Sequence, residues 1–206
     1  MSRLVAVVDY GMCNLDSVRR ALEEVGGRVV VTDQTADVEA ADVIVLPGVG
    51  AFPDAMRNVR DRDLDKVLED QVVGEGAPFL GICLGMQLLA TVGYEGRQTP
   101  GLGWIDGEVR RLVPAGADRR IPHVGWNEVN AADGSPLFAG IEPGSDFYFV
   151  HSYHLACDVT DDIAATTPYC GGFASAVSRG NVHAVQFHPE KSQRNGLRLL
   201  QNVLAL

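Results

Sequence analysis

The chain has 206 residues, of which 46% are hydrophobic and 21% charged, and it carries a formal net charge of −10 with a pI of about 4.8. This length allows one domain with a full hydrophobic core and is short for two, so we expect a single domain over residues 1–206. The acidic balance argues against nucleic acid and anionic membranes as partners, because both require clustered lysine and arginine.

The first residues and the cysteines limit the compartment and the cofactors. The opening stretch MSRLVAVVDYG has an apolar run too short for a signal peptide or a membrane span, so we expect a cytoplasmic protein. Neither CxxC nor Cys/His ligand spacing occurs around the cysteines, which are Cys13, Cys83, Cys157 and Cys170. We therefore predict no disulfide framework, no metal site and no cofactor.

Apolar runs in the first half of the chain predict strands that are buried on both faces. They lie at 4–8, 28–32, 42–48 and 78–82. Helices are expected at 15–25, at 56–76 as a charged, solvent-exposed helix, and at 84–93. Strands that alternate with helices indicate an α/β fold whose parallel sheet carries helices on both faces.

From residue 103 onward the pattern changes to strand-like runs that are separated by turns. These runs are 103–113, 146–159, 173–179 and 181–187. One further helix is expected at 192–205, with Ser192 as its N-cap. We expect the second half to add antiparallel or mixed strands to the sheet.

Cys83 lies between the last of the parallel strands and the following helix, in the stretch APFLGICLGMQLLA. A sharp strand-to-helix turn projects a side chain above the sheet, and Gly81 and Gly85 allow such a turn. The helix N-terminus then stabilises an anion such as a thiolate. The pattern predicts a nucleophile elbow; the alternative is a small buried core residue, the usual fate of a free cysteine.

A thiol nucleophile needs a base, and the base needs a group that orients it. The stretch VQFHPEKS supplies His188 after a predicted strand, and Glu190 projects to the same side two positions later. For this pair alone, a structural His-Pro-Glu turn is the alternative. Beside a cysteine elbow, a triad of Cys83, His188 and Glu190 is favoured.

An acyl-transfer site also needs amide donors for an oxyanion. The N–H of Leu84 directly follows the nucleophile, and the loop LPGVGAF leaves a neighbouring strand where open α/β sheets bind ligands. We therefore predict an oxyanion hole formed by Leu84 and by Gly48, Val49 and Gly50. Glycine loops after strands are common, so the loop alone is a weak signal.

These motifs resemble those of the class I glutamine amidotransferases. The family pattern G-x-C-x-G-x-Q is met by Gly81, Cys83, Gly85 and Gln87, and the His-Pro-Glu pattern follows near the C-terminus. Stretches from VVDYGMCNLDSV to VQFHPEKSQ, in order over residues 7–193, resemble the glutaminase subunits of imidazole glycerol phosphate synthase, from histidine biosynthesis. One departure is Cys13, where that family usually has glycine, and we assign it no chemistry.

The resemblance implies a flavodoxin-like, mostly parallel sheet and glutamine hydrolysis by a Cys-His-Glu triad. It places Gln87, His151, Ser152 and Tyr153 around the substrate glutamine, with a helix-turn role for Gln87 and a core role for Tyr153 as alternatives. It also implies a heterodimer with a (β/α)8-barrel cyclase subunit that takes up the ammonia. The products are then imidazole glycerol phosphate and an aminoimidazole carboxamide ribonucleotide.

For the contact with that subunit we expect Trp126 and Asn127, in the stretch HVGWN, and Lys191, directly after the triad glutamate. A buried Trp126 and an ordinary surface Lys191 are the alternatives. The resemblance further implies an isolated chain that is nearly inactive until the partner binds its nucleotide ligand. A backbone flip at Gly48–Val49–Gly50 that completes the oxyanion hole is one physical route.

Other functions stay open at this point: a glutaminase subunit of another synthase, a cysteine hydrolase of similar fold, and a non-catalytic scaffold. Related synthases usually have His where Met86 stands and a Pro-Gly-Pro-Gly loop around Val49. Cysteine hydrolases of this fold usually place their histidine soon after the cysteine, whereas CLGMQLL contains none. The intact Cys83, His188 and Glu190 argue against the scaffold.

Overall fold

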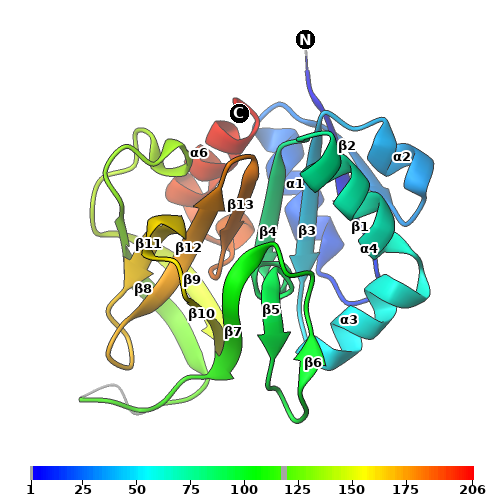
Figure 1. The fold of residues 1–206 in the computed structure, drawn as a ribbon. Coiled ribbons are helices and arrows are strands. Elements are labelled where there is room, and N and C mark those ends of the chain that lie inside the picture. Colours follow the sequence, from blue (N-terminus) through cyan, green and yellow to red (C-terminus); the bar gives the residue numbers. More distant parts are fainter. Residues whose placement is uncertain (1, 117–119) are drawn as a thin grey trace.

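The computed structural model describes residues 2–116 and 120–206, whose strands form a nine-stranded mixed sheet and a separate four-stranded sheet (Figure 1). The larger sheet has the order β2-β1-β3-β4-β13-β12-β11-β8-β9. Its parallel part consists of β2 (Arg28–Thr32), β1 (Leu4–Val8), β3 (Val43–Gly48), β4 (Phe79–Cys83) and β13 (Val182–Val185). This order is that of a flavodoxin-like sheet, and it makes β4 a central strand between β3 and β13.

Antiparallel strands continue the larger sheet beyond β13. They are β12 (Phe173–Arg179), β11 (Ile163–Thr167), β8 (His123–Ala131) and β9 (Ser145–His151). Each pairs antiparallel with its neighbour in the sheet. The predicted α/β fold, with a mostly parallel part and added antiparallel strands, is confirmed.

The four-stranded sheet, of order β10-β7-β5-β6, was not predicted as a separate layer. It consists of β10 (Tyr153–Cys157), β7 (Ile105–Arg111), β5 (Ala90–Gly93) and β6 (Thr99–Pro100). The run predicted as one strand at 146–159 is divided at Ser152 between the two sheets. Its first half, β9, extends the large sheet, and its second half, β10, pairs with β7.

Helices cover both faces of the parallel strands (Figure 1). They are α1 (Leu15–Glu24), α2 (Thr35–Glu39), α3 (Phe52–Asp61), α4 (Leu64–Leu68), α5 (Leu84–Gln87) and α6 (Gln193–Val203). Side chains of α1 and α6 share one apolar core with Val45 and Ile82, while α3 and α4 share the other with Ile44 and Leu46. Because alternate residues of a strand face opposite sides, each central strand contributes to both cores.

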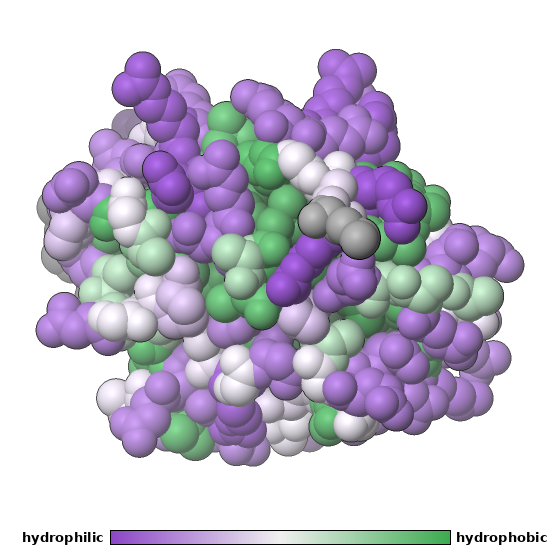
Figure 2. All heavy atoms as spheres, turned by 90° about the horizontal axis from the view of Figure 1, so that it is seen from above, coloured by the Kyte–Doolittle hydropathy of each residue, from purple (hydrophilic) through white to green (hydrophobic). Residues whose placement is uncertain are grey.

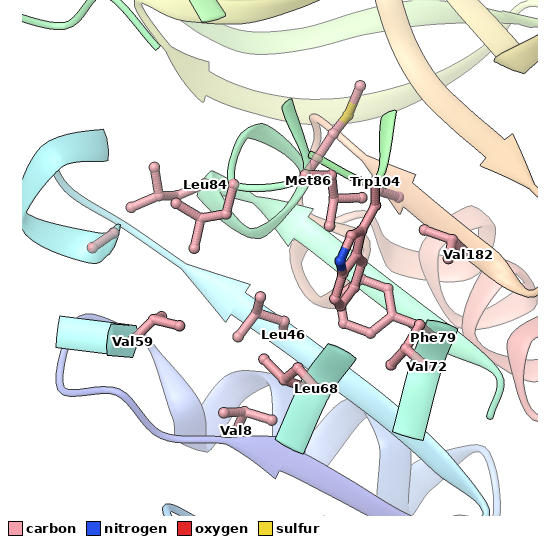
Figure 3. Close-up of a cluster of buried hydrophobic side chains, with 14 of the residues drawn as sticks. Val8, Leu46, Val59, Leu68, Val72, Phe79, Leu84, Met86, Trp104 and Val182 are labelled. Carbon is pink, nitrogen blue, oxygen red and sulfur yellow. The ribbon is translucent and has the colours of Figure 1, made fainter. Parts of the chain in front are cut away.

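The core under α3 and α4 also joins the two sheets. Figure 3 shows Val8 and Leu46 of the large sheet together with Phe79 and Trp104. Trp104, just before β7, packs edge-to-face on Phe79 of β4, with the ring centroids 5.2 Å apart. Such a buried aromatic pair adds to the energy of apolar burial and holds the small sheet over β4.

Two predicted helices are wrong in extent. The segment 84–93 forms only the single turn of α5 before it becomes β5, because Val92 and Gly93 pair with strands of the small sheet. The segment 56–76 divides into the end of α3, then α4, then a π-helical turn at Glu69–Gly74. It is not fully solvent-exposed, because it carries a buried stripe of Val59, Leu64, Val67, Leu68 and Val72.

The C-terminal helix is confirmed as α6, and Ser192 lies at its N-cap position as predicted, although its side chain does not cap the helix. Ser192 makes no side-chain hydrogen bond to the first turn of α6. Its hydroxyl donates instead to the carbonyl of His188 and accepts the N–H of Tyr148. Ser192 therefore fixes the turn that follows β13 against β9.

Hydrophilic side chains dominate the face seen in Figure 2, which is the end of the molecule where both termini lie in Figure 1. Among the described residues, the helices are all too short or too polar to cross a membrane.

Candidate active site

Cys83 ends β4 with backbone angles of φ +55° and ψ −107°. Non-glycine residues rarely adopt a positive φ, and a nucleophile elbow is one place where this strain occurs. The next turn packs tightly on β3, because a Cβ on Gly85 would lie 1.8 Å from the carbonyl oxygen of Leu46. Since α5 has only 4 residues, the helix N-terminal charge predicted beside the sulfur is small.

His188 and Glu190 reach Cys83 from the adjacent strand. Because β13 runs parallel to β4, with Val185 opposite Ile82, the chain beyond β13 emerges at the same edge as the cysteine. His188 Nδ1 lies 2.8 Å from Glu190 Oε1, and the two side chains are only 3% and 1% exposed. The structure therefore brings the three predicted triad residues together.

Opposed effects act on the His188 imidazole. Burial lowers its pKa, whereas hydrogen bonding and charge interactions with Cys83 and Glu190 raise it, and the net result is a pKa raised to about 10. Within the described residues Nε2 makes no hydrogen bond of good geometry, although the sulfur interacts with the ring. This nitrogen is thus placed to receive the thiol proton and form a thiolate–imidazolium pair.

The predicted oxyanion loop follows β3, next to the nucleophile. Gly48 pairs with Cys83 across β3 and β4, while Val49 and Gly50 line the pocket over the sulfur. However, the Val49 N–H donates to the carbonyl oxygen of Met12 over 2.8 Å. This amide is engaged within the protein and is not directed into the pocket.

A pocket of about 330 Å³ opens over Cys83, a volume typical of a site for a small molecule. It is lined by every predicted oxyanion and substrate residue except Gly48, and also by Glu95, Pro122 and Val150. A larger pocket of about 700 Å³ lies between β10 and β12, and its described lining includes none of the predicted site residues.

Gln87 is 5% exposed, and its amide nitrogen donates to the Tyr153 carbonyl oxygen at 2.9 Å and to Gln186 Oε1 at 3.0 Å. Both N–H groups are thereby used within the protein, and only the amide oxygen remains for a substrate. The side chain bonds to β10 and to the chain after β13, so it is not a cap of its own helix turn.

His151 lines the pocket, but both of its ring nitrogens are engaged. Nε2 lies 3.0 Å from His123 Nδ1, and Nδ1 lies 2.9 Å from the Tyr153 carbonyl oxygen. Burial lowers the pKa of His151 to about 3, and neighbouring histidines act in the same direction, against the carbonyl. The neutral ring therefore links two strands, and both of its nitrogens are used within the protein while His151 lines the pocket where the head of the substrate is expected.

Sequence reasoning missed two residues at this site. Glu95 lines the pocket, and its Oε2 accepts the N–H of Phe52 at 2.8 Å. Gln186 is fully buried and donates from Nε2 to Cys83 Sγ at 3.6 Å. A usable signal for Gln186 was a polar side chain inside the apolar run VHAVQF, two positions before His188.

Exposed apolar side chains lie beside the pocket over Cys83, and two of them, Val49 and Val150, line it. Val124 and Val150 pair across β8 and β9 and are 57% and 38% exposed, and Val49 is 40% exposed. Trp126, on β8, is 48% exposed and contacts the Tyr148 ring, so a buried position for this tryptophan is wrong. Together Val49, Val124, Trp126 and Val150 form what we term the apolar rim.

The other two predicted interface residues lie close to this rim. Asn127 is half-buried, with its Nδ2 atom 3.1 Å from His123 Nε2. Lys191 is also half-buried, in a turn held against β9 because His188 N–H donates to the Tyr148 carbonyl. The turn that carries Lys191 and the strand that pairs with Trp126 are therefore neighbours.

The model of the family "Glutamine amidotransferase class-I" matches residues 6–205. The chain therefore belongs to the class I glutamine amidotransferases. It is 48% identical to "Imidazole glycerol phosphate synthase subunit HisH" of Moorella thermoacetica, over 97% of this chain and 93% of that protein. It is 46% identical to the subunit of the same name from Rhodopirellula baltica, over 96% and 95%. Within the class, the chain is a member of the HisH family.

Solved structures show the same fold at low sequence identity. A putative GMP synthase protein from Thermoplasma acidophilum has a TM-score of 0.75 at 20% identity, covering 100% of this chain and 94% of that one. PurLQS from Thermotoga maritima has a TM-score of 0.74 at 19% identity, covering 100% and 99%. These structures match the mixed sheet with helices described above.

Proposed function

We propose that this chain is the glutaminase subunit of an imidazole glycerol phosphate synthase, in which residues 1–206 form one glutaminase domain. It hydrolyses glutamine to glutamate and passes the ammonia to a partner subunit for histidine biosynthesis. The observation that carries this proposal is the meeting of Cys83, His188 and Glu190 at the ends of two adjacent parallel strands.

The mechanism follows from this geometry. Cys83 Sγ loses its proton to His188 Nε2 and attacks the side-chain amide carbon of glutamine, giving a tetrahedral oxyanion. The C–N bond then breaks, and the imidazolium gives its proton to the departing nitrogen, which leaves as ammonia. His188 next takes a proton from water, which attacks the thioester and releases glutamate. Glu190 holds Nδ1 and stabilises the imidazolium in both steps.

Different groups of the pocket recognise different parts of the substrate glutamine. The amide oxygen of Gln87 and the carboxylate of Glu95 accept hydrogen bonds from the α-ammonium group or the side-chain amide of glutamine. Ser152 and Tyr153, at the junction of β9 and β10, contact the amino-acid head from the other wall of the pocket. The Leu84 amide and the loop Gly48–Val49–Gly50 serve the oxyanion.

The apolar rim supports a partner that covers the pocket. Ammonia reacts as a nucleophile only while it is unprotonated, so its transfer favours a passage shielded from water. We propose that a (β/α)8-barrel cyclase docks on the rim, on Asn127 and on Lys191. The cyclase then uses the ammonia to form imidazole glycerol phosphate and an aminoimidazole carboxamide ribonucleotide.

The Val49–Met12 hydrogen bond supports a low activity of the isolated chain. In this arrangement the Val49 amide cannot stabilise an oxyanion, and loss of one such donor typically reduces the rate by about 10²–10³. Docking of the partner, with its nucleotide ligand, then favours the conformation in which this amide turns into the pocket.

The test is replacement of the nucleophile in the complex with the barrel cyclase. We expect Cys83→Ala to reduce glutamine hydrolysis by a factor of roughly 10³ or more, because no covalent route remains. Cys157→Ala is the matched control, since Cys157 lies on β10 outside the pocket over Cys83, and it should retain wild-type activity.

Ammonia release from glutamine and glutamine-dependent turnover of the cyclase are measured on the same samples. Glutamine hydrolysis that persists in Cys83→Ala rules out the triad. Wild-type hydrolysis without cyclase turnover rules out the proposed partner.

A further inference from the structure

A chain of hydrogen bonds leads from a main-chain carbonyl to the nucleophile. The Tyr153 carbonyl oxygen accepts from Gln87 Nε2 at 2.9 Å, and the same nitrogen donates to Gln186 Oε1 at 3.0 Å. Gln186 Nε2 then donates to Cys83 Sγ at 3.6 Å. Gln186 is fully buried, and the two bonds engage both ends of its amide.

The carbonyl fixes the direction of every bond in this chain. A carbonyl oxygen only accepts, so the Gln87 atom beside it is the amide nitrogen. The Gln186 atom facing that nitrogen must then be its oxygen, which leaves the Gln186 nitrogen beside the sulfur. With this orientation Gln186 can only donate to Cys83.

The same carbonyl fixes a second arm, which leads to the surface. His151 Nδ1 donates to the Tyr153 carbonyl oxygen, so its Nε2 accepts from His123 Nδ1, and His123 Nε2 accepts from Asn127 Nδ2. An independent donor confirms the end of this arm. The N–H of Glu128 donates to Asn127 Oδ1 at 2.9 Å, which places the Asn127 nitrogen toward His123.

We propose that Gln186 is a catalytic residue of this site, which donates a hydrogen bond to the Cys83 thiolate and is held in the donor orientation by Gln87 and the Tyr153 carbonyl. The proposal rests on the assignment of Cys83 as the nucleophile. When the thiol proton moves from Sγ to His188 Nε2, negative charge stays on the sulfur. Gln186 keeps both of its protons throughout and takes part only as a donor.

The donor distinguishes the two protonation states of the sulfur. A hydrogen bond to an ionised acceptor is roughly twice as strong as one between neutral groups, so the thiolate gains more from Gln186 than the thiol does. The four-residue α5 supplies little positive charge to the sulfur. Gln186 therefore takes the role that the sequence alone assigns to a helix N-terminus.

The experiment compares alkylation of Cys83 by iodoacetamide in the full-length wild type, in Gln186→Met and in the control Gln201→Met. Gln201 is an exposed residue of α6 and offers the same substitution away from the site. Rates are measured from pH 6 to pH 9, and mass spectrometry of the Cys83 peptide separates this thiol from the other cysteines. Burial raises the pKa of Cys13 to about 11, so this thiol reacts slowly.

We expect Gln186→Met to lower the Cys83 rate at pH 7 by about tenfold or more and to move the pH profile to higher pH. Gln201→Met should match the wild type. Gln87→Met removes the donor that holds the Gln186 oxygen, so it should give a rate between those of wild type and Gln186→Met. If Gln186→Met does not fold, this variant tests the role of Gln186 instead.

Equal rates and equal pH profiles in wild type, Gln186→Met and Gln87→Met overturn the role of Gln186 while leaving Cys83 as the nucleophile. A wild-type Cys83 that resists alkylation across the whole range overturns the nucleophile itself. A lower rate at every pH with an unmoved profile also overturns the proposal, because it indicates a structural effect on access.

Discussion

The backbone of Cys83 lies in a region that costs about 1–3 kcal/mol for a residue with a side chain. Close packing on both sides of Cys83 holds this conformation, because a Cβ at Gly81 or at Gly85 would lie within 3 Å of backbone atoms. It turns the sulfur toward His188, while Cys83 as a whole is only 6% exposed. The strained backbone of Cys83 thus places its sulfur close to His188.

The His188–Glu190 pair predicts a stability that depends on pH. In the folded protein the pKa of His188 is about 10, above its ordinary value of 6.5. Protonated His188 therefore stabilises the folded state, and this contribution is complete below pH 6.5. This contribution is lost as the pH rises through about 10. Glu190→Gln removes the charge partner, so we expect it to lower the free energy of unfolding by about 2 kcal/mol at pH 6.

Urea unfolding of wild type and Glu190→Gln at pH 6 and pH 10 checks this expectation. The difference between the two proteins should shrink toward zero at the higher pH. A difference that grows with pH contradicts a raised pKa of His188.

Residue types and spacing were sufficient to predict Cys83, His188 and Glu190, because each lies in a motif whose chemistry is local. The orientation of the Gln186 amide was not predictable, since it depends on a carbonyl of β10, far away in the sequence. A flip of the Gly48–Val49–Gly50 loop was predicted, but the acceptor that holds the Val49 amide, the Met12 carbonyl, was not predictable for the same reason. The orientations of these two amides depend on contacts between segments that are distant in the sequence.

At the scale of elements, the helix after Cys83, α5, is short because the chain that follows it pairs as β5 in the four-stranded sheet. The run MQLLATVG has apolar spacing that also fits a helix, and its length alone did not distinguish the two. Pairing of β5 with β6 and β7 decides in favour of a strand. By contrast, the parallel strands were predicted well, since long β-branched runs buried on both faces have few alternatives.

Close packing of this turn predicts a strong effect of a single methyl group. Gly85→Ala places a Cβ against the carbonyl oxygen of Leu46, and backbone atoms cannot move aside without shifting β3. We expect a loss of about 3 kcal/mol in the free energy of unfolding, at the upper end for overpacking. Thermal and urea unfolding measure the loss.

Gly74→Ala is the matched control for that variant. Within the described part of the chain, a new Cβ at Gly74 meets one atom within 4 Å, the Glu69 carbonyl oxygen at 3.9 Å, so the change should stay within about 0.5 kcal/mol. Equal stability of the two variants contradicts the packing described for the elbow.

At the scale of the molecule, Arg179 ties the two sheets together in the part of the chain that the structure describes. It lies on β12, and its guanidinium donates to Asp162, to Asp106 on β7 and to the carbonyl of Trp104. Asp162 is 7% exposed and the bond is charge-assisted, so this contact is stronger than an ordinary surface ion pair.

We expect Arg179→Met to lower the free energy of unfolding by about 2 kcal/mol, because it leaves the buried Asp162 carboxylate without this donor. Arg20→Met is the control, since the Arg20 side chain is 73% exposed and its ion-pair partner among the described residues is the exposed Asp16. That control should change stability by less than about 0.5 kcal/mol. Urea unfolding at pH 7 checks both, and equal losses contradict the role of Arg179.

The position of β13 has a consequence for protein synthesis. Residues 182–185 leave the ribosome long after Cys83, yet this strand is the neighbour of the one that ends in Cys83. Until it emerges, the nascent polypeptide carries a sulfur without its histidine and a central strand with an open edge. Prematurely terminated products therefore cannot consume cellular glutamine, and their unpaired edge exposes them to aggregation or proteolytic clearance.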